Sequence, residues 1–186
     1  EKNAAELERQ VKNASAFLRD TAAEMNLAVV ARGREIRRER MGTTAAVLCV
    51  TREEAHIAHI GDSRIYRYRG GRLSALTEDD ILRREHGQVL TQYLGVEPSA
   101  HSIHPHIRKG ALRSGDLFLL CTDGVHGALS EREIAVILRR YGRDPTKCVE
   151  TLTEQALEKN GEDNATAIVV RFYKKPWWQR TKGKGV

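Results

Sequence analysis

The chain has 186 residues, of which 40% are hydrophobic and 30% are charged, and its formal net charge is +6. This length and composition are typical of one soluble globular domain with a sizeable core. No apolar run is long enough to span a bilayer, and the polar first residues lead us to expect no signal peptide.

The positive charge is concentrated at the end of the chain. Residues 174–186 contain five Lys or Arg and no acid, so the preceding part is close to neutral. We therefore expect no nucleic-acid partner. Trp177 and Trp178 beside these cations would suit an anionic membrane surface or an acidic partner, but a linker or a solvated tail is the preferred interpretation.

Cysteine usage points to a compartment. The three cysteines, Cys49, Cys121 and Cys148, include no CxxC pair, and two of them stand in apolar runs where a free thiol behaves as a small hydrophobe. We expect a reducing, cytoplasmic environment.

The first part of the chain has helical periodicity. Apolar residues at three- and four-residue spacing, among them Leu7, Val11 and Leu18, predict a helix from about Ala4 to Arg40. The charged run from Arg32 to Arg40 favours a solvated helix end or a loop over a phosphate clamp.

Strands are predicted next. The runs 43–50 and 55–60 are strand-like, and Gly61-Asp62 follows the second. Strands over 64–68 and 72–76 flank Gly70-Gly71, which is a two-residue hairpin signal. Thr77 and Asp80 then resemble a capping box that opens a short helix.

Three histidines, His101, His104 and His106, stand close together in a run that alternates polar and apolar residues. Such a cluster suggests zinc, but no cysteine or acid lies near in sequence to complete the ligand set. The proline at position 105 favours the alternative of a solvated edge strand.

The most informative stretch runs from Asp116 to Gly124. Leu117 to Cys121 is an unbroken apolar run, typical of a strand buried on both faces, although a buried helix has the same pattern. Asp123 follows it, and Gly124 permits a sharp turn. A carboxylate in such a crevice is costly to ionise unless a metal ion or an arginine accompanies it.

Two helices and a strand complete the chain. Ser130 with Glu133 forms a capping box, and Asp144 before Pro145 marks a second helix start. The run 165–170 is rich in β-branched residues and predicts a strand. Helices and antiparallel strands are segregated along the chain, which indicates the α+β class.

Three aspartates, Asp62, Asp123 and Asp163, stand at strand ends and would converge if these strands are neighbours. A purely oxygen ligand set suits magnesium or manganese rather than zinc. The alternative is that each aspartate only caps a turn, as Asp beside Gly or Asn often does.

Six short motifs follow one another along the chain: Met41-Gly42-Thr43-Thr44, Gly61-Asp62-Ser63-Arg64, Leu76-Thr77-Glu78-Asp79-Asp80, Leu90-Thr91-Gln92-Tyr93-Leu94-Gly95, Cys121-Thr122-Asp123-Gly124-Val125 and Glu162-Asp163-Asn164-Ala165-Thr166. In this order and spacing they resemble the protein phosphatase 2C family, the metal-dependent serine/threonine phosphatases of the PPM type, and most closely its bacterial members. The resemblance implies a four-layer α-β-β-α sandwich with two packed antiparallel sheets. It divides the chain into a phosphatase 2C-like domain over 1–173 and a basic, Trp-containing tail or linker over 174–186.

The resemblance also implies a chemistry. A water activated by two Mn²⁺ or Mg²⁺ ions would hydrolyse phosphoserine and phosphothreonine in substrates of a serine/threonine kinase. Asp123 and Asp163 match ligands of the core metal pair, and Asp62 matches a position that helps to hold a third, weaker metal. Gly61, Gly124 and Asn164 would support these ligands, and a monomer is expected.

The chain departs from the family pattern at two places. The family's first metal aspartate stands in an Asp-Gly-Met-Gly-Gly-like segment before the first helix, and no such segment is present, so the N-terminal strands are expected to be missing. The family's helical flap would have only Ile81 to Val89 available. The alternative function is therefore a non-catalytic interaction domain with an incomplete metal site.

His126 follows Asp123 closely and would lie near the site. It could donate a proton to the leaving oxygen. The preferred interpretation is a loop histidine on the rim.

Overall fold

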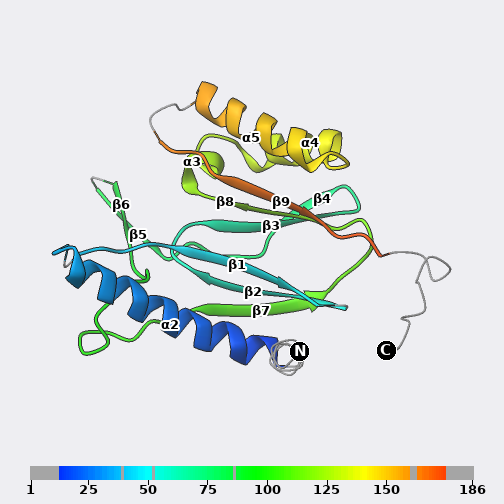
Figure 1. The fold of residues 1–186 in the computed structure, drawn as a ribbon. Helices are drawn as coiled ribbons and strands as arrows, with labels where there is room; N and C mark the ends of the chain where they lie inside the picture. Colours follow the sequence, from blue (N-terminus) through cyan, green and yellow to red (C-terminus); the bar gives the residue numbers. More distant parts are fainter. Residues whose placement is uncertain (1–12, 39, 52, 86, 160–162, 175–186) are drawn as a thin grey trace.

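Four layers make up the molecule in the order helix, sheet, sheet, helices (Figure 1). The structure, a computed structural model, describes residues 13–38, 40–51, 53–85, 87–159 and 163–174. The layers and the antiparallel strand pairing confirm the predicted α-β-β-α sandwich. The proposed division near residue 173 stays a prediction, because residues 175–186 lie outside the described part.

The first sheet has the order β1-β2-β7 and is antiparallel throughout. Its central strand, β2, is buried from Ala55 to Ile60 because a sheet covers one face and α2 the other. The bounds of these elements are Ala14–Glu35 for α2, Ala45–Val50 for β1, Glu54–Ile60 for β2 and His106–Ala111 for β7.

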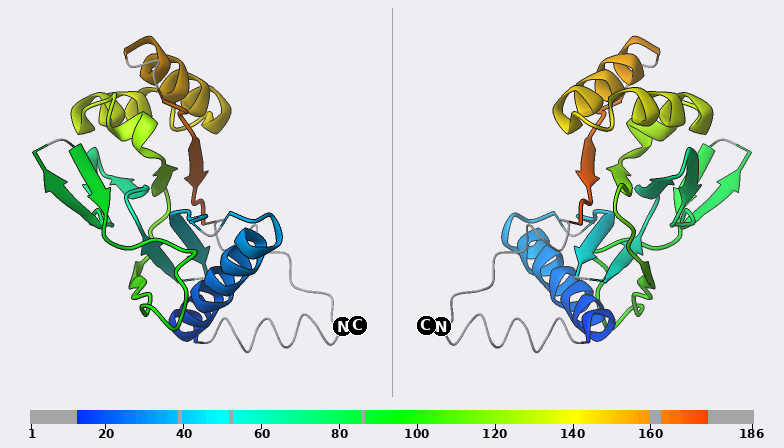
Figure 2. Two further views of the ribbon diagram at one scale, coloured as in Figure 1. Left: turned by 90° about the vertical axis from the view of Figure 1, so that its left-hand side faces the viewer. Right: turned by 90° about the vertical axis from the view of Figure 1, so that its right-hand side faces the viewer.

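The second sheet has the order β4-β3-β8-β9 and carries α4 and α5 on its outer face (Figure 2). Leu119, Leu138 and Leu152 meet in the core between this sheet and the two helices. The bounds are Arg64–Arg69 for β3, Arg72–Ala75 for β4, Leu117–Cys121 for β8, Glu131–Tyr141 for α4, Pro145–Lys159 for α5 and Ala167–Arg171 for β9.

Several local predictions are confirmed. Gly70 and Gly71 have φ of 55° and 85°, as the tight β3–β4 hairpin requires. Ser130 and Glu133 form the complete capping box at the start of α4. The Asp144 side chain accepts a hydrogen bond from the Lys147 amide at 3.1 Å and so caps α5.

The predicted helix start at Thr77 and Asp80 is wrong. Residues 77–80 are not helical, and a small hairpin of β5 (Ile81–Arg84) and β6 (Gly87–Leu90) follows them. The Thr77 hydroxyl accepts from the Ile65 amide at 3.1 Å, and Asp80 Oδ2 accepts from the Gly61 amide at 2.9 Å. Both side chains therefore accept hydrogen bonds from backbone amides where the chain crosses from β2 to β3, instead of capping a helix.

The first helix is shorter than predicted. Within the described residues α2 ends at Glu35, and Arg37 has a φ of 56° that no helix accommodates. Residues 4–12 of the prediction, with Leu7 and Val11, lie outside the described part. Arg34, from the charged run, pairs with Glu97 at 2.7 Å on the surface, in agreement with a solvated helix end.

The edge strand expected around the histidines is present. The predicted edge strand begins at His106 rather than His101 and lies at the edge of its sheet, as expected.

Burial raises the pKa of the Cys121 thiol to about 12 and that of Cys148 to about 11, so both behave as inert small hydrophobes. No helix in the described part of the chain is long and apolar enough to cross a membrane.

Candidate functional site

Asp62 lies at the sharp turn where the chain passes from the first sheet to the second. The turn depends on Gly61, which has a φ of 105°, and a Cβ there would come within 2.4 Å of the Thr44 methyl group. A glycine is therefore needed for conformation and for space. The Thr44 and Ser63 hydroxyls, 2.8 Å apart, fix the turn from its other side. Asp62 itself is half-buried.

Asp123 lies where β8 ends, as the sequence predicted. It is the first residue of the single-turn helix α3 (Asp123–His126), and its Oδ1 accepts from the Gly124 amide at 3.0 Å. Because Asp123 follows the buried run Leu117–Cys121, its half-buried carboxylate lies at the end of a central strand of the second sheet.

Asp163 lies in the loop that precedes β9, and this loop packs directly on the start of α3. Thr122 holds it by three hydrogen bonds. Its amide donates to the Thr166 carbonyl at 3.1 Å, its hydroxyl donates to the Asn164 carbonyl at 3.3 Å, and the Thr166 amide donates to that hydroxyl at 3.1 Å. A Cβ on Gly124 would lie 2.5 Å from the Asn164 carbonyl oxygen. Gly124 is therefore the residue that permits the loop carrying Asp163 to lie beside Asp123.

The electrostatics couple two of the three aspartates. Burial raises the pKa of Asp62 above its ordinary value, and the negative charge of Asp123 raises it further. Two carboxylates that repel each other in this way are stabilised together when a cation lies between them. Asp163 is exposed.

The three predicted ligands are thus neighbours rather than a compact ligand set. Among the described residues, they are not a group whose ligand atoms all approach within 4.8 Å of one another. Asp62 and Asp123 interact through their charges, whereas Asp163 is connected to Asp123 through the backbone of its loop. The metal-binding role of all three, and the supporting role of Gly61, Gly124 and Asn164, stay predictions.

His126 connects α3 to the turn of Asp62. Its Nε2 lies 3.0 Å from the Asp62 backbone carbonyl oxygen, and because a carbonyl only accepts, Nε2 carries the proton. Burial lowers the pKa of the ring, which favours the neutral form. This geometry favours a positioning residue over the proton donor that the sequence suggested as a second possibility.

An ion pair that the sequence did not predict lies beside the site. The Arg64 guanidinium binds Asp79 through two nitrogens, each at 2.7 Å, and the Tyr66 hydroxyl at 2.9 Å. Hydrogen bonding to Arg64 holds the pKa of Asp79 below its usual range. Arg64 therefore holds the start of β3, just after the Asp62 turn, against the segment that carries Asp79. Arg64 stands in the Gly-Asp-Ser-Arg motif, which singled it out in the sequence, but nothing in the sequence identified Asp79 as its partner.

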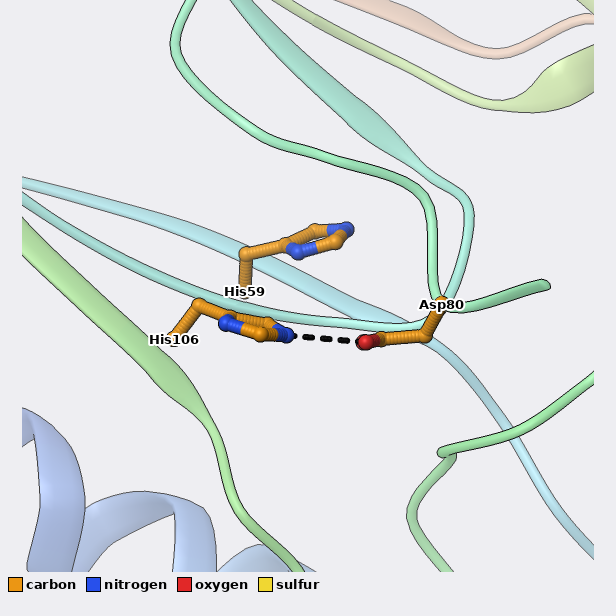
Figure 3. Close-up of side chains that lie close together, drawn as sticks. All are labelled: His59, Asp80 and His106. Carbon is orange, nitrogen blue, oxygen red and sulfur yellow. Dashed lines mark hydrogen bonds and ion pairs between the residues drawn. The ribbon is translucent and has the colours of Figure 1, made fainter.

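A second cluster was also missed. His59 of β2, His106 of β7 and Asp80 lie with one ligand atom each within 4.8 Å of the others (Figure 3). His106 is the only one of the three histidines singled out in the sequence that contributes. The acid that completes the group comes from the segment before β5, far away along the chain.

Comparison with known proteins gives a consistent assignment. A model of the protein phosphatase 2C family matches residues 2–161. The chain is 29% identical over 143 residues to the serine/threonine protein phosphatase PstP of Mycobacterium tuberculosis, covering 70% of this chain and 27% of that protein. It is 35% identical over 146 residues to the protein phosphatase PhpP of Streptococcus pneumoniae, covering 70% of this chain and 58% of that protein.

A solved structure is similar in fold. The catalytic domain of the serine/threonine protein phosphatase PstP in complex with 2 manganese ions superposes with a TM-score of 0.64 at 29% identity, covering 77% of this chain and 65% of that chain. The chain thus spans between about a quarter and somewhat over half of the length of the first curated relatives.

Proposed function

Because the chain belongs to the protein phosphatase 2C family, we propose that the protein hydrolyses phosphoserine and phosphothreonine in proteins with the help of Mn²⁺ or Mg²⁺. The observation that carries this proposal is the placement of two half-buried carboxylates at one end of the second sheet: Asp62 precedes Arg64 and Asp123 follows Cys121, and Arg64 and Cys121 are cross-strand partners in β3 and β8. Oxygen ligands of this kind suit hard divalent cations.

The residues fit such ions chemically. Asp123 and Asp163 would hold the core metal pair, and Asp62 would help to hold a third, weaker ion. Metal ions bound there would supply a water of lowered pKa and would neutralise charge on the phosphoryl oxygens. Burial and, to a smaller extent, the negative charge of Asp123 raise the pKa of Asp62, and a cation bound there would offset both the lost hydration and the repulsion.

The surrounding residues position the ligands. Gly124 and Thr122 keep the Asp163 loop against the start of α3, and His126 fixes the Asp62 turn to the same helix. The Arg64–Asp79 pair stiffens the following strand. Ligands held by packing and hydrogen bonds bind a metal with less loss of conformational freedom than mobile ones.

The same proposal includes the biological setting. The substrates would be proteins phosphorylated on serine or threonine by a kinase, since PstP is a serine/threonine protein phosphatase and PhpP a protein phosphatase. The buried free thiols Cys121 and Cys148 suit a reducing cytoplasm. A monomer, and a tail over 174–186 that acts as a linker, complete the proposal.

A phosphatase assay of the full-length protein tests it. We expect hydrolysis of a phosphothreonine peptide with Mn²⁺ or Mg²⁺ and none in EDTA. Asp123→Asn and Asp163→Asn should each abolish the metal-dependent rate. Asp144→Asn, which changes an aspartate at the remote start of α5, is the matched control and should keep it. Metal binding without hydrolysis would instead support the non-catalytic alternative, and full activity in EDTA would contradict the metal mechanism.

A further inference from the structure

We propose that His59, Asp80 and His106 form a zinc-binding site that is distinct from the carboxylate site at Asp62 and Asp123. The proposal does not depend on phosphatase activity. It is based on the placement of the three side chains, on the burial of His59 and on the groups that hold Asp80.

The fold brings the three ligands together from separate segments. His59 and His106 are direct cross-strand partners in the antiparallel pairing of β2 with β7, and their rings stack with centroids 5.9 Å apart. Asp80 approaches from the segment between β4 and β5, and its Oδ1 lies 2.8 Å from His106 Nε2 (Figure 3).

The distances between the three ligand atoms are close to those in a zinc site. All three ligand atoms lie within 4.8 Å of one another. Ligands on tetrahedral zinc, at about 2.0 to 2.1 Å from the ion, are about 3.3 Å apart. Small side-chain rotations are therefore sufficient to close the group around an ion.

The burial of His59, whose ring nitrogens lack hydrogen bonds of ordinary geometry, supports the proposal independently of the ligand distances. The residue is 1% exposed, and neither ring nitrogen has a hydrogen-bond partner of ordinary geometry among the described residues. The Ser63 backbone nearby has only the smallest influence on the pKa of the ring, too weak to count as a full hydrogen bond. Buried polar atoms are nearly always satisfied, and an imidazole without a partner at a cluster of ligands is explained by a bound ion. Burial also lowers the pKa of His59, which keeps the ring in the neutral form that binds metals.

Asp80 is held in place by groups outside the cluster. Its Oδ2 accepts from the Gly61 amide at 2.9 Å, and the Gln92 side-chain amide lies 3.3 Å from its Oδ1. The Gln92 carbonyl oxygen in turn accepts from the His104 amide at 2.9 Å. Supporting hydrogen bonds of this type orient carboxylate ligands in metal sites. Here they also connect the site to the turn that carries Asp62.

The ligand set favours zinc over the ions of the carboxylate site. Two imidazoles and one carboxylate are typical of zinc, whereas magnesium prefers oxygen ligands alone. Three protein ligands leave a fourth position for water. The His106 side chain is 46% exposed, so the ion can enter from solvent on that side.

Titration with Co²⁺ as a spectroscopic substitute for zinc tests the proposal in the intact chain. We expect one equivalent of Co²⁺ to produce the intense visible absorption of a four-coordinate ion, and Zn²⁺ but not excess Mg²⁺ to abolish it. His106→Gln and Asp80→Asn should each weaken binding by at least about 10-fold. His104→Gln changes a neighbouring exposed histidine whose ring is not in the cluster, so its affinity should equal that of the wild type.

Thermal unfolding gives a second readout. Zn²⁺ should raise the Tm of the wild type and of His104→Gln in a concentration-dependent manner, because a ligand that binds only the folded state stabilises it, and it should not raise that of His106→Gln. Weak, six-coordinate Co²⁺ absorption, or the same spectrum and affinity in His106→Gln, would overturn the proposal. The group would then be a hydrogen-bonded Asp80–His106 pair beside a neutral buried histidine.

Discussion

Replacing Gly124 with alanine should push the loop that carries Asp163 away from the start of α3. The added Cβ would lie 2.5 Å from the Asn164 carbonyl oxygen and 2.9 Å from its carbonyl carbon, whereas ordinary contacts begin near 3.4 Å. The loop must therefore move by roughly 0.9 Å, because backbone atoms cannot rotate aside as a flexible side chain can.

Opposing terms decide the size of the effect on the free energy of unfolding. Overpacking of this kind costs about 1 to 3 kcal/mol. Alanine has the better helix propensity and restricts the unfolded chain, which together return about 1 kcal/mol at most. We expect a net loss of about 1 to 2 kcal/mol, which for a chain of this size lowers the Tm by about 3 to 6 °C.

Urea denaturation followed by circular dichroism measures this loss, and calorimetric titration with Mn²⁺ measures the effect on the site. If Asp123 and Asp163 share a metal pair, the affinity should fall by about 10-fold, as when a residue that orients ligands is removed. Gly110→Ala is the matched control, since the nearest atom to its Cβ is Arg67 Nη1 at 3.9 Å. It should change stability by less than about 0.5 kcal/mol. A Gly124→Ala protein as stable as the Gly110→Ala protein would refute the contact on which the site is built.

Three further predictions follow from the rest of the chain. Asp116 is fully buried and binds Arg69 through two bonds of 2.6 Å, so Asp116→Asn should cost about 2 to 3 kcal/mol in urea denaturation, whereas Glu97→Gln, in the exposed pair with Arg34, should cost less than about 1 kcal/mol. Burial raises the pKa of Asp116, but the bonds from Arg69 and the Arg113 amide outweigh it and leave the pKa lowered. The stability that this group contributes is therefore present above the unfolded pKa of about 4 and is lost as the pH falls through the folded pKa. The Tm of the wild type should fall as the pH is lowered below about 4, and the Tm of Asp116→Asn should fall less steeply. Deleting residues 176–186, which have no helical or strand periodicity, should leave the Tm almost unchanged, and a large drop would show that the tail packs on the domain.

Local features of the structure were predictable because they depend on residues close together in sequence. The apolar run Leu117–Cys121 is the buried strand β8, and the turn at Gly70 and Gly71 adopts the positive φ values that the hairpin needs. Asp123 stands at the end of its strand for the same local reason. The family resemblance, carried by motif order, added the four layers, which periodicity alone does not specify.

Thr77 and Asp80 show where local reasoning failed. Their spacing matches a helix cap, but the buried amides of Ile65 and Gly61 compete for the same side chains. Satisfying those amides outweighs a helix terminus, because an unpaired buried amide is costly and a helix end can bond to water. No pattern within a few residues of Asp80 reveals this competition.

By itself, the sequence determined the class of the fold, the strand-end position of Asp123 and the hard character of the ligands it offers. Only the tertiary structure decided which distant residues meet. The register of β2 against β7 places His59 opposite His106, and the close approach at Gly124 places the Asp163 loop beside Asp123. Such contacts depend on how the sheets pair and pack over the whole chain, and local periodicity, which records only which face of an element is buried, carries no information about them.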